Sequence, residues 1–334
     1  MPRSVLFALM LAFWPALMPS LAFADRCHGQ NLITALPADQ LATLQTMAEV
    51  PFAHGNLWQA TKGGQTITLA GTYHLNDARF GPILDRLTPY LQIATTLLVE
   101  AGPDEEAALK ERMLKEPGLI YALSGPTLPE QMSEANWQRL STALKARGMW
   151  PALVAKMRPW LLTTLLSMPP CMFPLDPGAG QGLDKRLMSL AAARGVPIKA
   201  LEPYDTILDI FSATPPADQL TVLFQAVEGD AHADDMVTTL AESYFGGECR
   251  LYWEWSRQQM LSQPGMTSAE ADRQMALVEG SILAPRNKAW IPVLEEAAAK
   301  GPILAAFGAL HLSGDSGVLN LLAERGWTVT PLKP

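Results

Sequence analysis

The sequence is poor in the features that mark several common classes of protein. Its 334 residues include only three cysteines and no Cys-x-x-Cys pair, so neither a dithiol redox motif nor a zinc ribbon is indicated. Acidic residues outnumber basic ones, and the formal net charge of −8 argues against nucleic acid as a partner. The Gly-x-Ser-x-Gly elbow of many serine hydrolases is also missing from the sequence.

What the sequence has in quantity is apolar residues, which make up 49% of the chain. That proportion suits a folded protein with a large core and not a disordered one. No Ser/Gly-rich linker and no run of charge divides the sequence into halves. We therefore expect one domain over residues 25–334.

The first 24 residues have the pattern of a secretory signal peptide. Arg3 precedes a nearly continuous apolar run from Val5 to Met18, and Ala22-Phe23-Ala24 forms a small-residue cleavage site. An uncleaved membrane anchor is the alternative. We expect no membrane span after this segment, because basic residues and a proline at 156–159 interrupt the most apolar later stretch. The sequence thus predicts a periplasmic or secreted protein.

Export would place the three cysteines, Cys27, Cys171 and Cys249, in an oxidising compartment. One disulfide and one free thiol is the simplest arrangement, and the sequence does not indicate which two cysteines pair. Cys171 lies among prolines with no histidine close to it in sequence, so a disulfide is favoured over a nucleophilic role.

Two similar motifs stand near opposite ends of the chain. Gly71-Thr72-Tyr73-His74 follows the apolar run at residues 66–70, and Gly308-Ala309-Leu310-His311 follows the run at residues 302–307. Both runs are short and aliphatic, which is typical of buried strands. Each histidine is therefore predicted just past the carboxyl end of a core strand, where open α/β sheets bind their ligands.

Two further apolar runs end in a carboxylate. Residues 95–99 stop at Glu100 and residues 197–201 stop at Glu202. Between the first histidine motif and Glu100, residues 77–91 have a helical pattern, so the order is that of a β-α-β unit with parallel strands. We expect the four strand ends to converge and to bring two histidines and two glutamates together.

The remaining pattern is mostly helical. Residues 56–60 and 66–70 flank Lys62-Gly63-Gly64 and predict a hairpin, whereas residues 104–169 and 215–300 predict helices interrupted by prolines. The apolar stretch 149–168 is interpreted as core, with a lid or pocket wall as the alternative. The prediction is an α/β fold with a mixed central sheet, flanked by helices and carrying a large helical insertion.

Two other motifs suggest chemistry but have simpler interpretations. Gly178 to Gly182 precedes a helix beginning near Asp184, yet it lacks the residues of a phosphate-binding loop, and Asp184 is interpreted as an N-cap. The acidic residues at 228–235, with His232 among them, alternate by two and would not share one helix face. A solvated acidic turn is favoured over a metal site there.

Two histidines and a carboxylate match the ligand set of a catalytic metal with an open position. The bound water would act as nucleophile, and the carboxylate off the metal could serve as base. Arg286 could hold a carboxylate or stabilise an oxyanion. A satisfied structural role is the alternative for each histidine.

Taken together, these motifs resemble the TraB/GumN family, which is related to the Tiki metalloproteases. The similarity includes the two histidine motifs, the strand ends at Glu100 and Glu202, Gly182-Leu183-Asp184 before a helix, and Arg286-Asn287 ahead of the second motif. The resemblance implies a mixed sheet akin to that of erythromycin esterases and the haem-binding ChaN-like proteins. It also implies a metal-dependent peptidase site made by His74, Glu100 and His311, with Glu202, Asp184, Arg286 and Asn287 as further candidates.

Three hypotheses follow from the residues and the resemblance. The first is an exported hydrolase, a peptidase, that uses a divalent metal such as manganese, cobalt or zinc and acts on a peptide or other small substrate. The second is a non-catalytic binding or regulatory protein that holds a peptide or haem in the same pocket. The third is an esterase in which histidine acts as general base without a metal.

Overall fold

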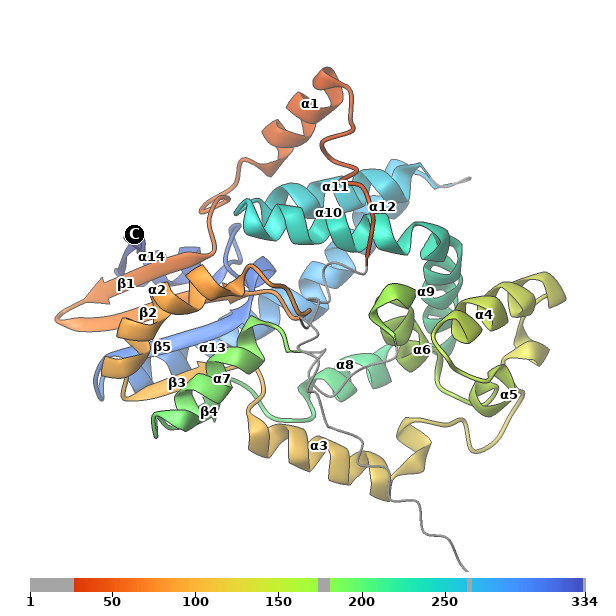
Figure 1. The fold of residues 1–334 in the computed structure, drawn as a ribbon, viewed down its shortest axis with the longest axis horizontal. Helices are drawn as coiled ribbons and strands as arrows, with labels where there is room; N and C mark the ends of the chain where they lie inside the picture. The colour runs from red at the N-terminus through yellow and green to blue at the C-terminus, as the bar shows by residue number, and fades with distance from the viewer. Residues whose placement is uncertain (1–26, 174–180, 263–265, 333–334) are drawn as a thin grey trace, which may run out of the picture.

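The structure, a computed structural model, describes residues 27–173, 181–262 and 266–332 (Figure 1). The predicted signal peptide at residues 1–24 lies outside the described residues, as does the glycine-rich stretch up to residue 180. Within the described ranges, no helix is both long enough and apolar enough to cross a bilayer.

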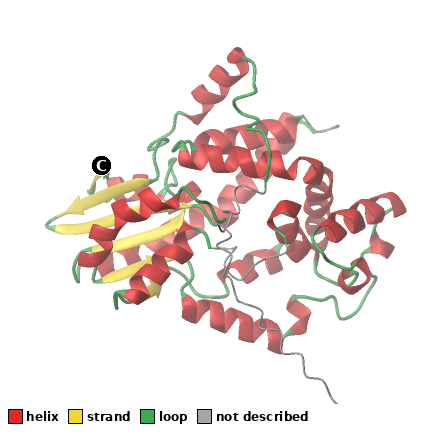
Figure 2. Ribbon diagram, viewed as in Figure 1, coloured by secondary structure: helices red, strands yellow, loops and turns green. Residues whose placement is uncertain are grey.

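A six-stranded mixed sheet forms one side of the molecule (Figure 2). Its strands are β1 (Leu57–Lys62), β2 (Gln65–Thr72), β3 (Thr96–Val99), β4 (Ile198–Ala200), β5 (Ile303–Gly308) and β6 (Thr328–Pro331), in the order β4-β3-β5-β2-β1-β6. The first four in that order are parallel, whereas β1 runs antiparallel to both β2 and β6. The predicted mixed α/β sheet is confirmed.

The hairpin and the β-α-β unit explain how the chain enters this sheet. Gly63 and Gly64 join β1 to β2 with φ values of 56° and 84°, as a two-residue type I′ turn requires. Helix α2 (Phe80–Ile93) then leads from β2 to β3, but β5 lies between these two parallel strands. The ends of β2, β5 and β3 therefore stand side by side at one edge of the sheet.

Helices bury both faces of the sheet. Successive strand residues point to opposite faces, so Leu97 packs with α2 and α7 (Leu183–Ala193), whereas Leu98 packs with α13 (Ala284–Ala298) and α14 (Val318–Glu324). Trp290 of α13 is fully buried on the second face. These two apolar layers fix α7 and α13 against the strands, and both helices carry residues of the candidate site.

The helical side of the molecule comes from two stretches between the strands (Figure 1). The first holds α3 (Pro103–Lys115), α4 (Glu134–Ala146), α5 (Pro151–Val154) and α6 (Pro159–Leu166); the second holds α8 (Thr206–Ala213), α9 (Pro216–Gly229), α10 (Ala233–Phe245), α11 (Cys249–Leu261) and α12 (Ser268–Val278). Helix α1 (Ala38–Ala48) packs on α11 through Leu44 and Trp255. Leu162 and Leu166 of α6 are buried with Leu223 of α9, which supports the core interpretation for the later part of the stretch 149–168. At its start the interpretation is wrong, because Trp150 and Leu153 are exposed.

The cysteine pairing, which the sequence left open, is Cys27 with Cys171. Cys249 is a free, buried thiol at the start of α11. The interpretation of residues 228–235 as a solvated turn is wrong for Asp230, because its carboxylate accepts a hydrogen bond from the buried Arg147 at 2.6 Å. Asp235 also has a distant partner, because its Oδ1 accepts from the backbone N–H of Gln30 at 2.8 Å, whereas Glu228 is exposed.

Candidate functional site

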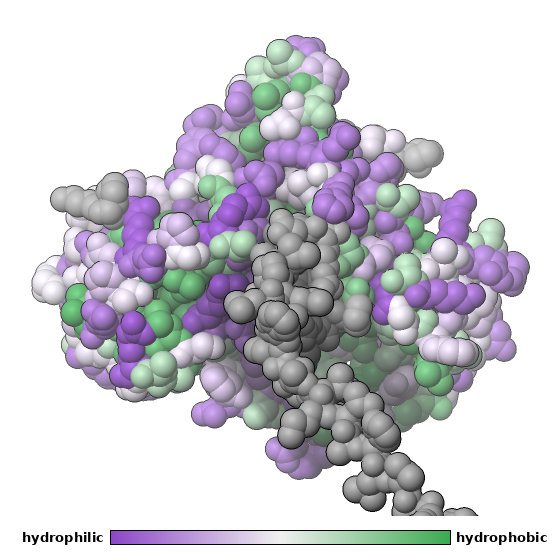
Figure 3. Space-filling view, viewed as in Figure 1, coloured by the Kyte–Doolittle hydropathy of each residue, from purple (hydrophilic) through white to green (hydrophobic). Residues whose placement is uncertain are grey.

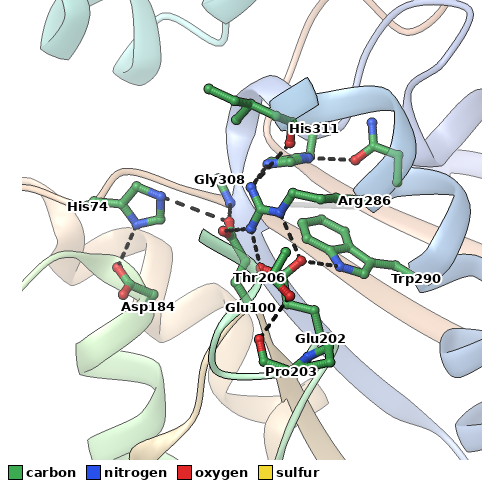
Figure 4. Close-up of polar contacts among 12 residues, drawn as sticks. His74, Glu100, Asp184, Glu202, Pro203, Thr206, Arg286, Trp290, Gly308 and His311 are labelled. Carbon is green, nitrogen blue, oxygen red and sulfur yellow. Dashed lines mark hydrogen bonds and ion pairs between the residues drawn. The ribbon is translucent and has the colours of Figure 1, made fainter. Parts of the chain in front are cut away.

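The four predicted strand ends do converge in space (Figure 4). His74 follows β2, Glu100 follows β3, and Glu202 lies just beyond β4, while His311 ends the short 3-10 turn after β5. They are connected through a fifth side chain, Arg286, which enters from the first turns of α13. The sheet order accounts for this, because parallel neighbours end at the same edge.

Arg286 is the centre of the cluster, and its side chain is only 7% exposed. Its Nε donates to Glu202 Oε2 at 2.8 Å and its Nη2 donates to Glu202 Oε1 at 2.6 Å. The same Nη2 also donates to Glu100 Oε2 at 2.7 Å. One guanidinium thus bridges two carboxylates from neighbouring strands, in the two-point geometry that makes such pairs strong.

Glu202 accepts a third hydrogen bond, from Trp290 Nε1 at 3.0 Å. Both of its oxygens thus accept hydrogen bonds from Arg286 or Trp290. Its position suits holding Arg286 in place better than serving as the general base that the sequence suggested.

Glu100 uses Oε2 to pair with Arg286 and has its second oxygen, Oε1, toward His74 and Gly308. Oε1 accepts from the backbone N–H of Gly308 at 2.6 Å and lies 4.0 Å from His74 Nε2. Burial raises the pKa of this carboxyl, but the nearby His311, His74 and Arg286 and the Gly308 amide outweigh it and lower the pKa to about 2. Glu100 is therefore an anion at neutral pH.

His311 is held in place by Asn287, which follows Arg286 on α13. Asn287 Nδ2 donates to the carbonyl of Ser316 at 2.9 Å, which turns its Oδ1 toward His311 Nδ1 at 2.5 Å. This arrangement assigns the imidazole proton to Nδ1 and leaves the lone pair on Nε2, 3.3 Å from Arg286 Nη1. Burial, together with the charge of Arg286, lowers the pKa of His311 to about 4, so the ring is neutral.

His74 is held by Asp184 of α7, whose Oδ1 lies 3.3 Å from His74 Nδ1. The N-cap interpretation of Asp184 is wrong, because Gly182 occupies that position and Asp184 lies in the first turn of the helix. Burial lowers the pKa of His74, but the hydrogen bond to Asp184 and the charges of Glu100 and Asp184 raise it above its ordinary value overall. The His74 side chain remains 58% exposed.

At each of the two motif glycines, Gly71 and Gly308, residues of the other motif lie so close that a side chain would not fit. A Cβ on Gly71 would stand 2.6 Å from Leu312 Cδ1 and 3.0 Å from Ala309, so the first glycine admits the turn that follows β5. A Cβ on Gly308 would stand 3.1 Å from His74 Nε2 and 3.3 Å from Glu100 Oε1. Close approach of the two motifs explains both glycines, and neither has a positive φ.

All seven candidate residues belong to this one network, Asp184 through His74 and Asn287 through His311. Three contributors escaped the sequence analysis: the indole of Trp290, the amide of Gly308 and the carbonyl of Ser316. Trp290 has the pattern of a core residue, and backbone groups leave no trace in side-chain identity. The only available signal was the Gly at 308, which marks a close approach without naming its partner.

His74, Glu100 and His311 are the nitrogen and oxygen donors from which a divalent metal site could be built here. Both histidines hold Nδ1 against an oxygen, as metal-binding histidines usually do. His74 Nε2 lies 4.0 Å from Glu100 Oε1, whereas His311 Nε2 lies 3.3 Å from Arg286 Nη1. The space above Gly308, where a Cβ would sit, is bounded by His74, Glu100 and the His311 ring. The residues fit a metal ion in type, and Arg286 Nη1 would have to move away from His311 Nε2 for that nitrogen to bind it. His74, Glu100 and His311 do not have three donor atoms within 4.8 Å of one another.

The one group of described residues that does meet this spacing is Cys27, Cys171 and Asp234. Its two sulfur atoms are joined in the disulfide, so they are not free to bind an ion there.

Comparison with known proteins supports the interpretation at the level of the family. A search of curated proteins finds no match to this chain. The family that does match is described as the TraB/PrgY/gumN family, and the match extends over residues 56–331. That range begins just before β1, ends in β6 and includes all seven candidate residues. The chain belongs to the TraB/PrgY/gumN family.

Proposed function

We propose that this chain is an exported, metal-dependent hydrolase that cleaves peptides, with His74, Glu100 and His311 as the residues that hold the metal. The observation that carries the proposal is the matched orientation of the two histidines. Each has Nδ1 held by an oxygen, from Asp184 in one case and Asn287 in the other, and each turns its opposite edge to the space above Gly308. Metal-binding histidines usually have this arrangement, because the oxygen at Nδ1 fixes the ring and leaves Nε2 for the metal.

A divalent ion such as manganese, cobalt or zinc, when bound there, would supply an acidified water and polarise the scissile carbonyl. The protein's own groups have distinct tasks. Glu100 stays ionised because Arg286 and the Gly308 amide stabilise its negative charge. Arg286, fixed by Glu202, offers positive charge to an oxyanion that develops in the reaction. Asp184 fixes the ring orientation of His74.

A second function has its own supporting observation. Arg286 pairs with both Glu100 and Glu202, so each carboxylate already has a cationic partner within the protein and no bound ion is needed to hold the cluster together. A binding protein that holds a peptide or haem without turnover would be stable with this arrangement. His74, the most exposed member of the cluster, would then meet the ligand directly.

The experiment is a cleavage assay with a peptide library on the chain from Asp25 onward, which contains every described residue. The hydrolase proposal expects cleavage that is lost on chelation, returns with one of the three metals, and is abolished in Glu100→Gln. Peptide binding without cleavage in the wild type, or a Soret band on the purified protein, would favour the binding function. Cleavage that survives chelation would contradict the metal and point to the esterase-type mechanism.

Two finer points belong to the same proposal. Export is supported by the sequence pattern of residues 1–24 and by the Cys27–Cys171 disulfide, since such bonds persist in oxidising compartments. The relation of the sheet to that of erythromycin esterases and ChaN-like proteins is supported by its mixed strands and helical cover.

A further inference from the structure

Exposed apolar side chains concentrate at one place on the helical side. Among the described residues, ten large hydrophobic side chains are exposed, and four of them lie in residues 121–123 and 150–153. Trp150 and Leu153 are both 75% exposed, Leu123 is 72% exposed and Tyr121 is 36% exposed. Trp150 and Leu153, three residues apart at the start of α5, fall on the same side of that turn.

These two segments lie against each other. Tyr121 forms an isolated antiparallel bridge with Met157, and the amide of Ala122 donates to the carbonyl of Lys156 at 2.7 Å. The four side chains, Tyr121, Leu123, Trp150 and Leu153, therefore belong to one region, called here the tip patch. Figure 1 places α5 at the outer end of the helical side, away from the sheet.

The charge around the tip patch is opposite to that of the protein. Residues 121–158, which span the tip patch, contain five basic residues, Arg139, Lys145, Arg147, Lys156 and Arg158, and two acidic ones, Glu130 and Glu134, whereas the whole chain has a net charge of −8. Arg147 is buried on Asp230, but Lys145 and Lys156 are exposed on either side of α5. Glu130 lies close enough to Lys156 to offset part of this charge.

We propose that the tip patch docks the protein on an anionic lipid surface, with Trp150 and Leu153 inserted among the headgroups. Trp and Leu flanked by Lys are the side chains that enter a membrane interface, and lysines beside them gain from anionic lipid. A bilayer needs no preformed groove, which suits a convex turn such as α5. The inference does not depend on the proposed hydrolase activity.

A second copy of the chain is a less suitable occupant. A symmetric dimer through the tip patch would place Lys145 and Lys156 against the same residues of the partner, and like charges would repel. An anionic lipid surface satisfies the apolar and the basic side chains together. The orientation would leave the sheet as the part of the molecule far from the membrane (Figure 1).

The test is flotation with vesicles, using the chain from Asp25 onward so that the apolar N-terminal stretch does not itself bind lipid. Vesicles made of equal parts phosphatidylcholine and phosphatidylglycerol are compared with vesicles of phosphatidylcholine alone. We expect salt-sensitive binding to the mixed vesicles and weak binding to the neutral ones. Replacing both anchors, in Trp150→Ala/Leu153→Ala, should lower the partition coefficient by about tenfold or more.

The matched control is Ile93→Ala/Leu277→Ala, which removes two hydrophobic side chains that are each 64% exposed elsewhere. This control should bind like the wild type, and Lys145→Gln/Lys156→Gln should lose the preference for anionic vesicles. Circular dichroism melting verifies that each variant is folded. No binding by the wild type, or equal loss in the anchor and control variants, would overturn the proposal. Concentration-dependent dimerisation that disappears in the anchor variant, without vesicle binding, would assign the patch to self-association instead.

Discussion

Arg286 and Glu202 form a two-point ion pair in which Nε and Nη2 donate to the two carboxylate oxygens at 2.8 and 2.6 Å. The pair joins the strand end after β4 to the start of α13, and the same guanidinium reaches on to Glu100. A buried charge destabilises the fold unless it is paired, so removing Arg286 would leave two buried carboxylates without a cation and lower the free energy of unfolding. The first prediction rests on this relationship.

Arg286→Met should lower the free energy of unfolding by about 3–5 kcal/mol, because Glu100 and Glu202 would be left without their cation. Arg286→Lys should lie between that variant and the wild type, because lysine keeps the charge and loses the planar fork. Urea denaturation measures both.

The control for this comparison is Arg325→Met. Arg325 also makes two contacts with a carboxylate, that of Glu295, but its side chain is 54% exposed. An exposed pair of this kind contributes at most about 1 kcal/mol. Equal losses for Arg286→Met and Arg325→Met would show that the buried network is not what stabilises this region.

The two motif glycines should respond differently to alanine. Gly71→Ala places a methyl group against Leu312 and the Ala309 backbone, both buried, and should cost about 1–3 kcal/mol of stability through overpacking. In Gly308→Ala the nearest contact is His74, whose side chain is more than half exposed and free to move, so stability should change less while ligand binding is lost. Thermal melting and metal or peptide titration on both variants separate the two effects, and the reverse order would contradict the assignment.

Acid should destabilise the protein in two stages, because His311 and Glu100 have depressed pKa values, and the raised pKa of His74 offsets part of that loss. Folding lowers the pKa of His311 from 6.5 to about 4. The unfolded state therefore takes up the proton first, and the free energy of unfolding falls as pH drops from 6.5 toward 4. The pKa of Glu100 is lowered from 4.5 to about 2, so the free energy of unfolding falls further as pH drops between these two values. Urea titrations from pH 8 to pH 3 measure the curve.

His311→Gln should remove the upper stage of that acid curve and shrink the lower one, because the charge of His311 helps to lower the pKa of Glu100. His232→Gln is the control, because that side chain is 71% exposed and lies far from β5 in the sequence. Wild-type and His311→Gln curves of equal slope between pH 6.5 and pH 5 would contradict the neutral, buried state of His311.

The three cysteines should behave as one unreactive thiol, Cys249, and one disulfide, Cys27–Cys171. Cys249 is 7% exposed and burial raises its pKa to about 12, so a thiol reagent should find no reactive group until the chain is unfolded. Reduction of Cys27–Cys171 should lower the free energy of unfolding by about 2–5 kcal/mol. A native chain that reacts with one equivalent of reagent would mean that Cys249 is accessible.

The sequence predicted the parts of the site that follow local patterns. His74, Glu100, Glu202 and His311 each come just after a short apolar run, and the residues at strand ends in a parallel sheet must lie near one edge. The hairpin at Gly63-Gly64 was equally local, because only glycine accepts both positive φ values easily.

The rest depends on contacts between segments far apart in sequence. The position of β5 between β2 and β3 is a choice of long-range pairing, and so is the Cys27–Cys171 bridge across 144 residues. Trp290 has the pattern of a core residue and its hydrogen bond to Glu202 is visible only in the fold. Asp184 was placed at the correct helix end but given the wrong partner, because a capping residue and a histidine-holding carboxylate look alike in sequence.

The most direct measurement of the central claim is the metal content of the chain from Asp25 onward, by mass spectrometry after incubation with manganese, cobalt and zinc. The wild type is compared with His74→Ala, His311→Ala and the exposed control His232→Ala. The proposal predicts about one divalent ion per chain in the wild type and the control, and loss of that ion in the other two variants. No ion in the wild type, or an ion retained in both His74→Ala and His311→Ala, would contradict it.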